Sequence, residues 1–186
     1  KTVNPLQFPF HQQDMTIEGG DVLVAREDVL LIGMSGRTNS KAIDFFIERF
    51  KRNKTDKHII VQELPTEPES FIHLDMVFTF LDTNKCMVYE PLILQNNRYQ
   101  TLHIYIKNGH VEYIRKEKNL LSALEDLGFK LEPVLCGGDA DPWNQKREQW
   151  HSGANFFAVG PGKLIGYERN IYTVDALNKH GFAVLR

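Results

Sequence analysis

The feature that most constrains the fold is a pattern of two short apolar runs followed by a helix, which recurs along the chain. Each pair of runs is separated by a few polar or glycine residues, which predicts a strand, a tight turn and a second strand. The paired runs are residues 20–24 with 29–32, 75–80 with 86–89, and 153–157 with 164–165. The chain is therefore expected to be built from repeated units.

Helical spacing follows the first and third pairs. After an arginine and a polar partner, residues 42–47 and residues 174–177 place apolar side chains on one helical face. Strand pairs that alternate with helices predict an α/β fold, and repeats of this size favour a radial or stacked arrangement. No Pro/Ser-rich linker divides residues 1–186, so one domain is expected.

Composition excludes several classes of function. The chain has 186 residues, 42% of them hydrophobic, and can bury a core of ordinary size. Its formal net charge is −2 with both signs interspersed, so no basic face is offered to a nucleic acid. The longest apolar stretches, such as residues 156–159, are too short to cross a bilayer, and no membrane association is expected.

Two cysteines bear on compartment and chemistry. Cys86 lies in an apolar strand-like run and Cys136 precedes a Gly-Gly turn, so both indicate reduced thiols of a cytoplasmic protein. Cys86 is expected in the core, and Cys136 is only a weak candidate for a nucleophile. The chain starts at Lys1 and ends after a strand-like stretch, residues 182–185, which we interpret as cuts within a longer product.

A histidine and several acids form the candidate site. His73 and Asp75 are two apart at the mouth of a predicted strand, so period-two geometry directs both side chains to one face. Asp21 occupies the equivalent place in the first unit, and Glu18 precedes the Gly-Gly pair there. Carboxylates bind a planar guanidinium through bidentate, charge-assisted hydrogen bonds, and Arg37 could bind a substrate carboxylate by the same geometry.

Several motifs in this order resemble arginine deiminase, a member of the pentein (guanidino-group-modifying) superfamily. The resemblance runs from about Thr16 to the last residue. It is carried by residues 16–22, 32–38, 71–79, 147–150 and 165–170. It implies a pentein-type α/β propeller of five strand-strand-helix-strand units around a central site, of which this chain would supply about three.

The resemblance also implies roles for individual residues. The general acid/base histidine falls on His73, a guanidinium-holding aspartate on Asp75, the glutamate that hydrogen-bonds the histidine on Glu18, and a substrate-carboxylate arginine on Arg37. Asp21 is a further candidate for substrate binding, and it is equally expected to hold the Gly-Gly turn instead.

The family's nucleophile is a cysteine thiolate that forms a thiouronium intermediate on the way from L-arginine to L-citrulline and ammonia. It lies beyond the region that matches residues 181–184, so the resemblance implies no nucleophile in this chain. A second substrate-holding aspartate precedes the region that matches residues 8–11. No cofactor and no metal are implied, and the isolated chain is expected to be inactive.

Three alternatives stay open from the residues. A metal-dependent hydrolase could use His73, Asp75 and Glu18 or Asp21 as ligands, although no second histidine stands at a ligand spacing. A guanidino-binding module would recognise the same ligand without turnover. An amidinotransferase or agmatine deiminase would share the superfamily, but Arg37 favours a substrate with a carboxylate. The sequence leaves open whether the chain forms a homo-oligomer.

Overall fold

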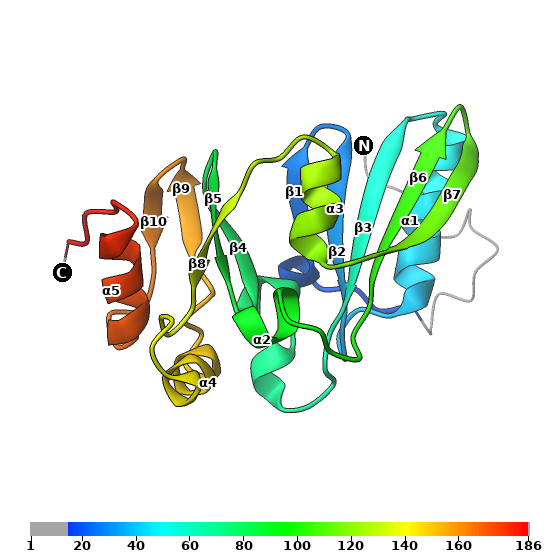
Figure 1. The fold of residues 1–186 in the computed structure, drawn as a ribbon. Coiled ribbons are helices and arrows are strands. Elements are labelled where there is room, and N and C mark those ends of the chain that lie inside the picture. Colours follow the sequence, from blue (N-terminus) through cyan, green and yellow to red (C-terminus); the bar gives the residue numbers. More distant parts are fainter. Residues whose placement is uncertain (1–14, 186) are drawn as a thin grey trace.

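A computed structural model describes residues 15–185, which form a mixed α/β structure with three β-sheets (Figure 1). The sequence prediction of an α/β fold is confirmed. The described residues contain two complete strand-strand-helix-strand units and the strand pair and helix of a third, and they do not form a closed propeller. The resemblance places the second substrate-holding aspartate before residues 8–11, and these residues lie outside the described part of the chain.

The first unit is a hairpin, a helix and a third strand that returns parallel to the second. Asn39 caps the helix, since its side chain accepts a hydrogen bond from the backbone N–H of Ala42, and three basic residues in the last turn face the negative end of the helix dipole. Because β2 is apolar almost throughout, both of its faces are buried. The elements are β1 (Val22–Arg26), β2 (Val29–Met34), α1 (Ser40–Arg52) and β3 (Lys57–Glu63).

The second unit repeats this order but carries an inserted hairpin. Its last strand, β8, runs parallel to β5, as β3 does to β2. The inserted strands β6 and β7 leave their own unit and extend the first sheet, which has the order β1-β2-β3-β6-β7. The elements are β4 (Phe78–Asp82), β5 (Lys85–Val88), α2 (Glu90–Ile93), β6 (Thr101–Lys107), β7 (His110–Glu117), α3 (Leu120–Asp126) and β8 (Glu132–Leu135).

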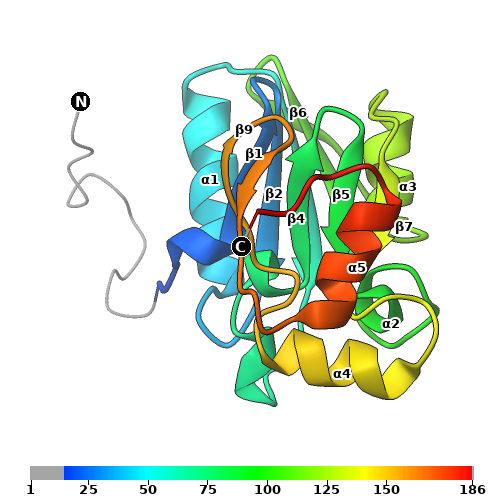
Figure 2. The same ribbon diagram turned by 90° about the vertical axis from the view of Figure 1, so that its left-hand side faces the viewer.

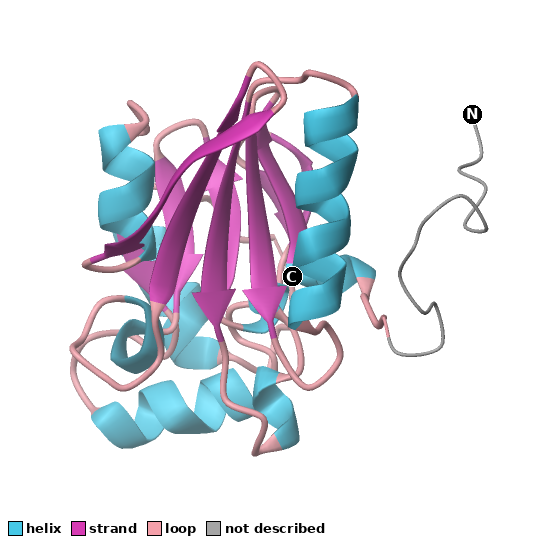
Figure 3. Cartoon of the chain, turned by 90° about the vertical axis from the view of Figure 1, so that its right-hand side faces the viewer, coloured by secondary structure: helices cyan, strands magenta, loops and turns pink. Residues whose placement is uncertain are grey.

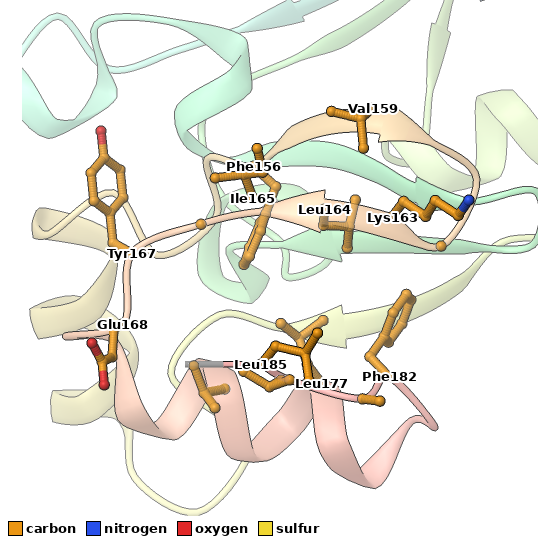
Figure 4. Close-up of a pocket in the computed structure, with 15 residues that line it drawn as sticks. Phe156, Val159, Lys163, Leu164, Ile165, Tyr167, Glu168, Leu177, Phe182 and Leu185 are labelled. Carbon is orange, nitrogen blue, oxygen red and sulfur yellow. The ribbon is translucent and has the colours of Figure 1, made fainter.

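After α4 (Pro142–Trp150), the third unit consists of the hairpin of β9 (Phe157–Gly160) and β10 (Lys163–Ile165), followed by α5 (Ile171–Lys179). The prediction that residues 182–185 form a strand is wrong for this structure, because this stretch has no strand pairing. An apolar groove of about 560 Å³ separates it from β10, with Leu164, Leu177 and Phe182 among its lining side chains (Figure 4).

Three hydrophobic clusters hold the layers together. Helices α1 and α3 flank opposite faces of the five-stranded sheet (Figure 3), because alternate residues of β3 point to opposite sides: Ile59 joins the cluster beneath α1 and Ile60 the cluster that contains α3. The cluster that contains α3 continues to Phe78 and Val88 in the sheet of β4, β5 and β8. Helix α5 covers the other face of that sheet (Figure 2).

Two large aromatic side chains lie at the surface. Trp150 is 58% exposed and Phe157 is 68% exposed, whereas Phe156 packs against the hydrophobic cluster beneath α5. Aromatic character alone does not fix burial, because much of any folded surface is apolar. Cys86 is fully buried, as predicted. None of the helices between residues 15 and 185 combines the length and the apolar character needed to span a membrane.

Candidate functional site

The predicted site residues come together where the first strands of two units begin. Glu18 precedes a short 3-10 helix, Gly19–Asp21, that leads directly into β1. His73 precedes a matching 3-10 helix, Leu74–Met76, that leads toward β4. Arg37 lies in the loop between β2 and α1. Residues that are 55 positions apart in sequence, such as Glu18 and His73, therefore meet across the junction of the two units.

The closest contact in the site joins the histidine to a glutamate. His73 Nε2 lies 2.7 Å from Glu18 Oε2, a charge-assisted hydrogen-bond distance. Because an ionised carboxylate can only accept, the proton on this side of the ring is on Nε2. The bond fixes the orientation of the imidazole and leaves Nδ1 facing Gly20 and Asp75. Such a carboxylate–imidazole pair is suited to proton transfer.

Asp75 presents a carboxylate oxygen that has no protein partner. Its Oδ1 is buried without a hydrogen bond and lies 3.9 Å from His73 Nδ1, which is too far for a hydrogen bond. Burial raises the pKa of Asp75, an effect that the nearby His73 and the Asn155 side chain oppose and that Asp21 adds to. A buried, unpaired acceptor is costly, and a cationic ligand with N–H donors would satisfy it.

The two side chains face each other for a reason different from the one expected. Strand alternation was expected to direct His73 and Asp75 to one face, but β4 begins only at Phe78. The intervening residues instead form the 3-10 helix, whose tight turn brings the side chain of Asp75 back toward the histidine that precedes it. The predicted proximity is present, and its cause is a helical turn.

Asp21 joins the two units from within. Its side chain is fully buried; Oδ1 accepts a hydrogen bond from the Leu74 backbone N–H at 2.9 Å, and Oδ2 accepts one from Ser35 Oγ at 2.7 Å. Burial raises the pKa of Asp21, whereas the hydrogen bonds from Ser35 and Thr38 lower it. Because both oxygens are engaged within the protein, this geometry suits a residue that positions the His73 turn.

A Cβ atom on Gly33 of β2 would lie 2.3 Å from Asp21 Oδ1 and 2.9 Å from the Leu74 side chain. The absence of a side chain at this position is what allows the Asp21 carboxylate to approach the strand so closely.

The loop that carries Arg37 is tied to the same network. The Ser35 hydroxyl accepts hydrogen bonds from the backbone N–H groups of Arg37 and Thr38, at 3.0 and 3.1 Å. The Thr38 hydroxyl accepts one from the Glu18 backbone N–H at 3.1 Å. The guanidinium remains largely accessible: the Arg37 side chain is 56% exposed, and its Nη1 lies 3.7 Å from Glu18 Oε1. A positive group thus stands at the rim of an otherwise acidic site.

Sequence reasoning assigned no role to Ser35, Thr38 or Gly33. Their motif, residues 32–38, was recognised, but only its arginine carries obvious chemistry. A signal was present, because hydroxyl residues on either side of a glycine–arginine pair are typical of a turn held by side chain to backbone hydrogen bonds. What the sequence could not indicate is that this turn also holds the Asp21 carboxylate.

The two cysteines stand apart from this chemistry. Both are fully buried, and burial raises the pKa of Cys86 and of Cys136 to about 12. Thiols in such surroundings are protonated at neutral pH and react slowly. The described residues also do not bring together three His, Cys, Asp or Glu side chains in a geometry that could hold a metal ion.

Comparison with known proteins gives consistent results. A family model described as arginine deiminase matches residues 5–186. The chain is 38% identical over 186 residues to an arginine deiminase of Mycoplasma capricolum subsp. capricolum, and this match covers 96% of this chain and 45% of that protein. It is 35% identical over 170 residues to an arginine deiminase of Oenococcus oeni, and this match covers 90% of this chain and 41% of that protein. The chain thus spans less than half the length of these relatives.

Proposed function

The chain belongs to the arginine deiminase family, and we propose that it supplies the histidine and carboxylate part of a site that hydrolyses L-arginine to L-citrulline and ammonia. The observation that carries the proposal is the arrangement around His73. One of its ring nitrogens is held by Glu18 at 2.7 Å, and the other faces Asp75, whose buried Oδ1 has no partner.

In the proposed reaction Asp75 binds the guanidinium group of the substrate. Two parallel N–H···O bonds between a guanidinium and a carboxylate would orient the reacting carbon and satisfy the unpaired Oδ1. The positive charge of the substrate would also favour the ionised form of Asp75, against the effect of burial. Arg37, exposed at the rim, would bind the α-carboxylate at the other end of the substrate.

His73 moves the protons. A cysteine thiolate attacks the guanidinium carbon to form a C–S bond, and cleavage of a C–N bond releases ammonia after His73 donates a proton to the leaving nitrogen. The histidine then takes a proton from water, which attacks the thiouronium carbon, and the C–S bond breaks to give citrulline and the thiolate. Glu18 holds the imidazole in one orientation through both steps.

We place the nucleophile outside residues 1–186. Cys86 and Cys136 are the only cysteines in the sequence, and both are buried, with pKa values raised to about 12. The chain spans 45% of the first relative and 41% of the second, which leaves room for the missing part of the site. The described units would then form part of one larger catalytic domain. Two free thiols also suit a cytoplasmic enzyme.

The test is citrulline formation from L-arginine by the full-length protein and by its His73→Ala variant. The parent is expected to form citrulline, and the variant is expected to lose activity while circular dichroism shows an intact fold. A folded His73→Ala protein that keeps its activity would overturn the role of His73. The isolated 186-residue chain is expected to fold and to form no citrulline.

One alternative uses the same geometry. A guanidino-binding module would need only the carboxylate of Asp75 and the cation of Arg37, and both are present. Saturable arginine binding by the full-length protein without citrulline formation would favour this alternative over hydrolysis.

A further inference from the structure

The third unit places a polar residue at the same point as the acids of the first two. Asp21 lies just before β1 and Asp75 three residues before β4, and Asn155 lies two residues before β9. Each therefore stands where the first strand of a unit begins, and two of the three already belong to the candidate site. At the third position the charged carboxylate is replaced by a neutral amide.

The end of α4 fixes the position of Asn155. After the helix, the backbone of Ser152 adopts a left-handed conformation with φ of 60°, and Gly153 N–H donates to the Glu148 carbonyl at 2.7 Å. A Cβ atom on Gly153 would lie 2.8 Å from Cys136 Sγ, so this turn packs closely against the residue that follows β8. The Asn155 N–H then donates to the Ser152 carbonyl at 3.1 Å.

A buried threonine joins this turn to the turn that carries Asp75. Thr79 Oγ1, on β4, donates to the Ala154 carbonyl at 2.8 Å and lies 3.4 Å from the Asp75 carbonyl. The hydroxyl thus brings the backbone of the residue before Asn155 next to the backbone of Asp75. This contact spans 75 positions in sequence and sets the third unit against the second at the candidate site.

From this geometry we infer that Asn155 is a positioning residue, which directs its side-chain amide at the Asp75 carboxylate and keeps that carboxylate oriented and ionised for a guanidinium ligand. The inference rests on the proposed function for its consequence in catalysis. Its structural part, the coupling of Asn155 to Asp75, does not depend on that function.

The chemistry explains why an amide suits this position better than a third carboxylate. Three influences already act on the ionisation of Asp75: burial and the charge of Asp21 raise its pKa, and His73 lowers it. An amide N–H of Asn155 directed at the carboxylate lowers the pKa of Asp75 as well, without adding a charge. An aspartate in its place would add a negative charge beside Asp75 and Asp21, which favours the protonated form that cannot bind a cation well. The Glu18 carboxylate is hydrogen-bonded to His73, which lies between it and Asp75.

The direct test is the pKa of Asp75, measured from its carboxyl carbon resonance in protein with carbon-13-labelled aspartate. The resonance is assigned by its loss in Asp75→Asn. In Asn155→Ala the pKa is expected to rise by about one unit, since a hydrogen bond to a charged group has roughly that effect. In Asn155→Asp, which keeps the size of the side chain, the rise is expected to be larger. Asn178→Ala, exposed on α5, is the matched control.

The kinetic test uses the full-length protein. Below the pKa of Asp75, kcat/KM for L-arginine is expected to fall about tenfold in Asn155→Ala relative to Asn178→Ala, and the difference should narrow as pH rises. A merely structural role would lower activity equally at all pH values. An unchanged Asp75 pKa in Asn155→Ala, or in Asn155→Asp if the alanine variant does not fold, would overturn the inference. A parent protein without citrulline formation would overturn the proposed function and leave the resonance measurement decisive for Asn155.

Discussion

Gly20 packs directly against the imidazole of His73. A Cβ atom on this glycine would lie 2.6 Å from His73 Nδ1 and 2.8 Å from its Cγ, distances that real Cβ atoms do not tolerate. It would also lie 3.0 Å from Asp75 Oδ2. The first unit therefore contributes a bare stretch of backbone against which the histidine of the second unit is held, opposite its hydrogen bond to Glu18.

The first prediction follows from this contact. Gly20→Ala should displace the imidazole and lower kcat/KM for L-arginine by about 100-fold, because a misplacement of about 1 Å at a reacting group has an effect of that order. The free energy of unfolding should fall by about 1 kcal/mol, at the low end of the range for overpacking. Steady-state kinetics and denaturant unfolding of the full-length protein provide the measurements.

The neighbouring glycine supplies the control for this prediction. A Cβ atom on Gly19 would have no heavy atom within 4 Å, so Gly19→Ala should leave kcat/KM close to that of the parent. Equal activity in the two alanine variants would show that the close packing on His73 does not matter for catalysis.

A second prediction concerns Arg37 and the choice of substrate. If its guanidinium binds the substrate carboxylate, Arg37→Ala should raise KM for L-arginine by roughly 30- to 100-fold, which corresponds to the loss of about 2–3 kcal/mol from one charge-assisted contact. Arg37→Lys should recover part of the loss, since an ammonium keeps the charge without the bidentate geometry.

Agmatine, which has no carboxylate, is the internal control for Arg37. Any turnover of agmatine should be the same in the parent and in Arg37→Ala, so the preference for arginine over agmatine should fall. A preference that does not change would assign another role to the exposed guanidinium, such as its contact with Glu18, where Nη1 lies 3.7 Å from Oε1.

Much of the repeated architecture could be predicted because it is encoded locally. The hairpins β1–β2 and β4–β5 come from apolar runs on either side of a turn, and α1 and α5 from helical spacing within a single segment. The inserted hairpin β6–β7 was not predicted, and its pairing with β3 depends on contacts far apart in sequence. No local pattern specifies that kind of partner.

The candidate site shows the same division. The residue types and their order indicated a histidine and acids, but the contacts that hold them are long-range. Leu74 N–H donates to Asp21 across 53 positions, and Thr79 contacts the Ala154 carbonyl across 75. These bonds form only after the units pack together. The exposure of individual aromatic side chains could not be predicted from the sequence either: Phe156 packs against the core, whereas its neighbour Phe157 is exposed on β9.

A third prediction concerns the thiols. With pKa values raised to about 12 and no exposed surface, Cys86 and Cys136 should not react with a disulfide reagent at pH 8 while the 186-residue chain is folded. Both should react after unfolding in guanidinium chloride. A time course of thiol release measures this, and one thiol that reacts rapidly in the folded chain would make that cysteine a candidate nucleophile.

A fourth prediction concerns stability and a pair of histidines remote from the candidate site in sequence. His103 is fully buried between two partners: its Nδ1 lies 3.2 Å from Glu117 Oε1, and its Nε2 lies 2.9 Å from His58 Nδ1. Because a carboxylate only accepts, His103 donates from Nδ1 to Glu117. Burial favours the neutral form of His103, whose Nε2 then accepts a hydrogen bond from His58 Nδ1. Burial is the largest cause that lowers the pKa of both histidines.

The sign of the effect on stability follows from these shifts. Above the unfolded-state pKa of about 6.5, both states hold neutral imidazoles. Below it the unfolded chain binds protons that the folded chain does not, so the free energy of unfolding falls as pH falls. Between pH 7 and pH 5 the loss should be on the order of 1–3 kcal/mol for the pair. His103→Gln should reduce this pH dependence, whereas His110→Gln, exposed at the start of β7, should not. Urea unfolding at a series of pH values measures the slope, and equal slopes in His103→Gln and the parent would show that the buried pair does not control acid stability.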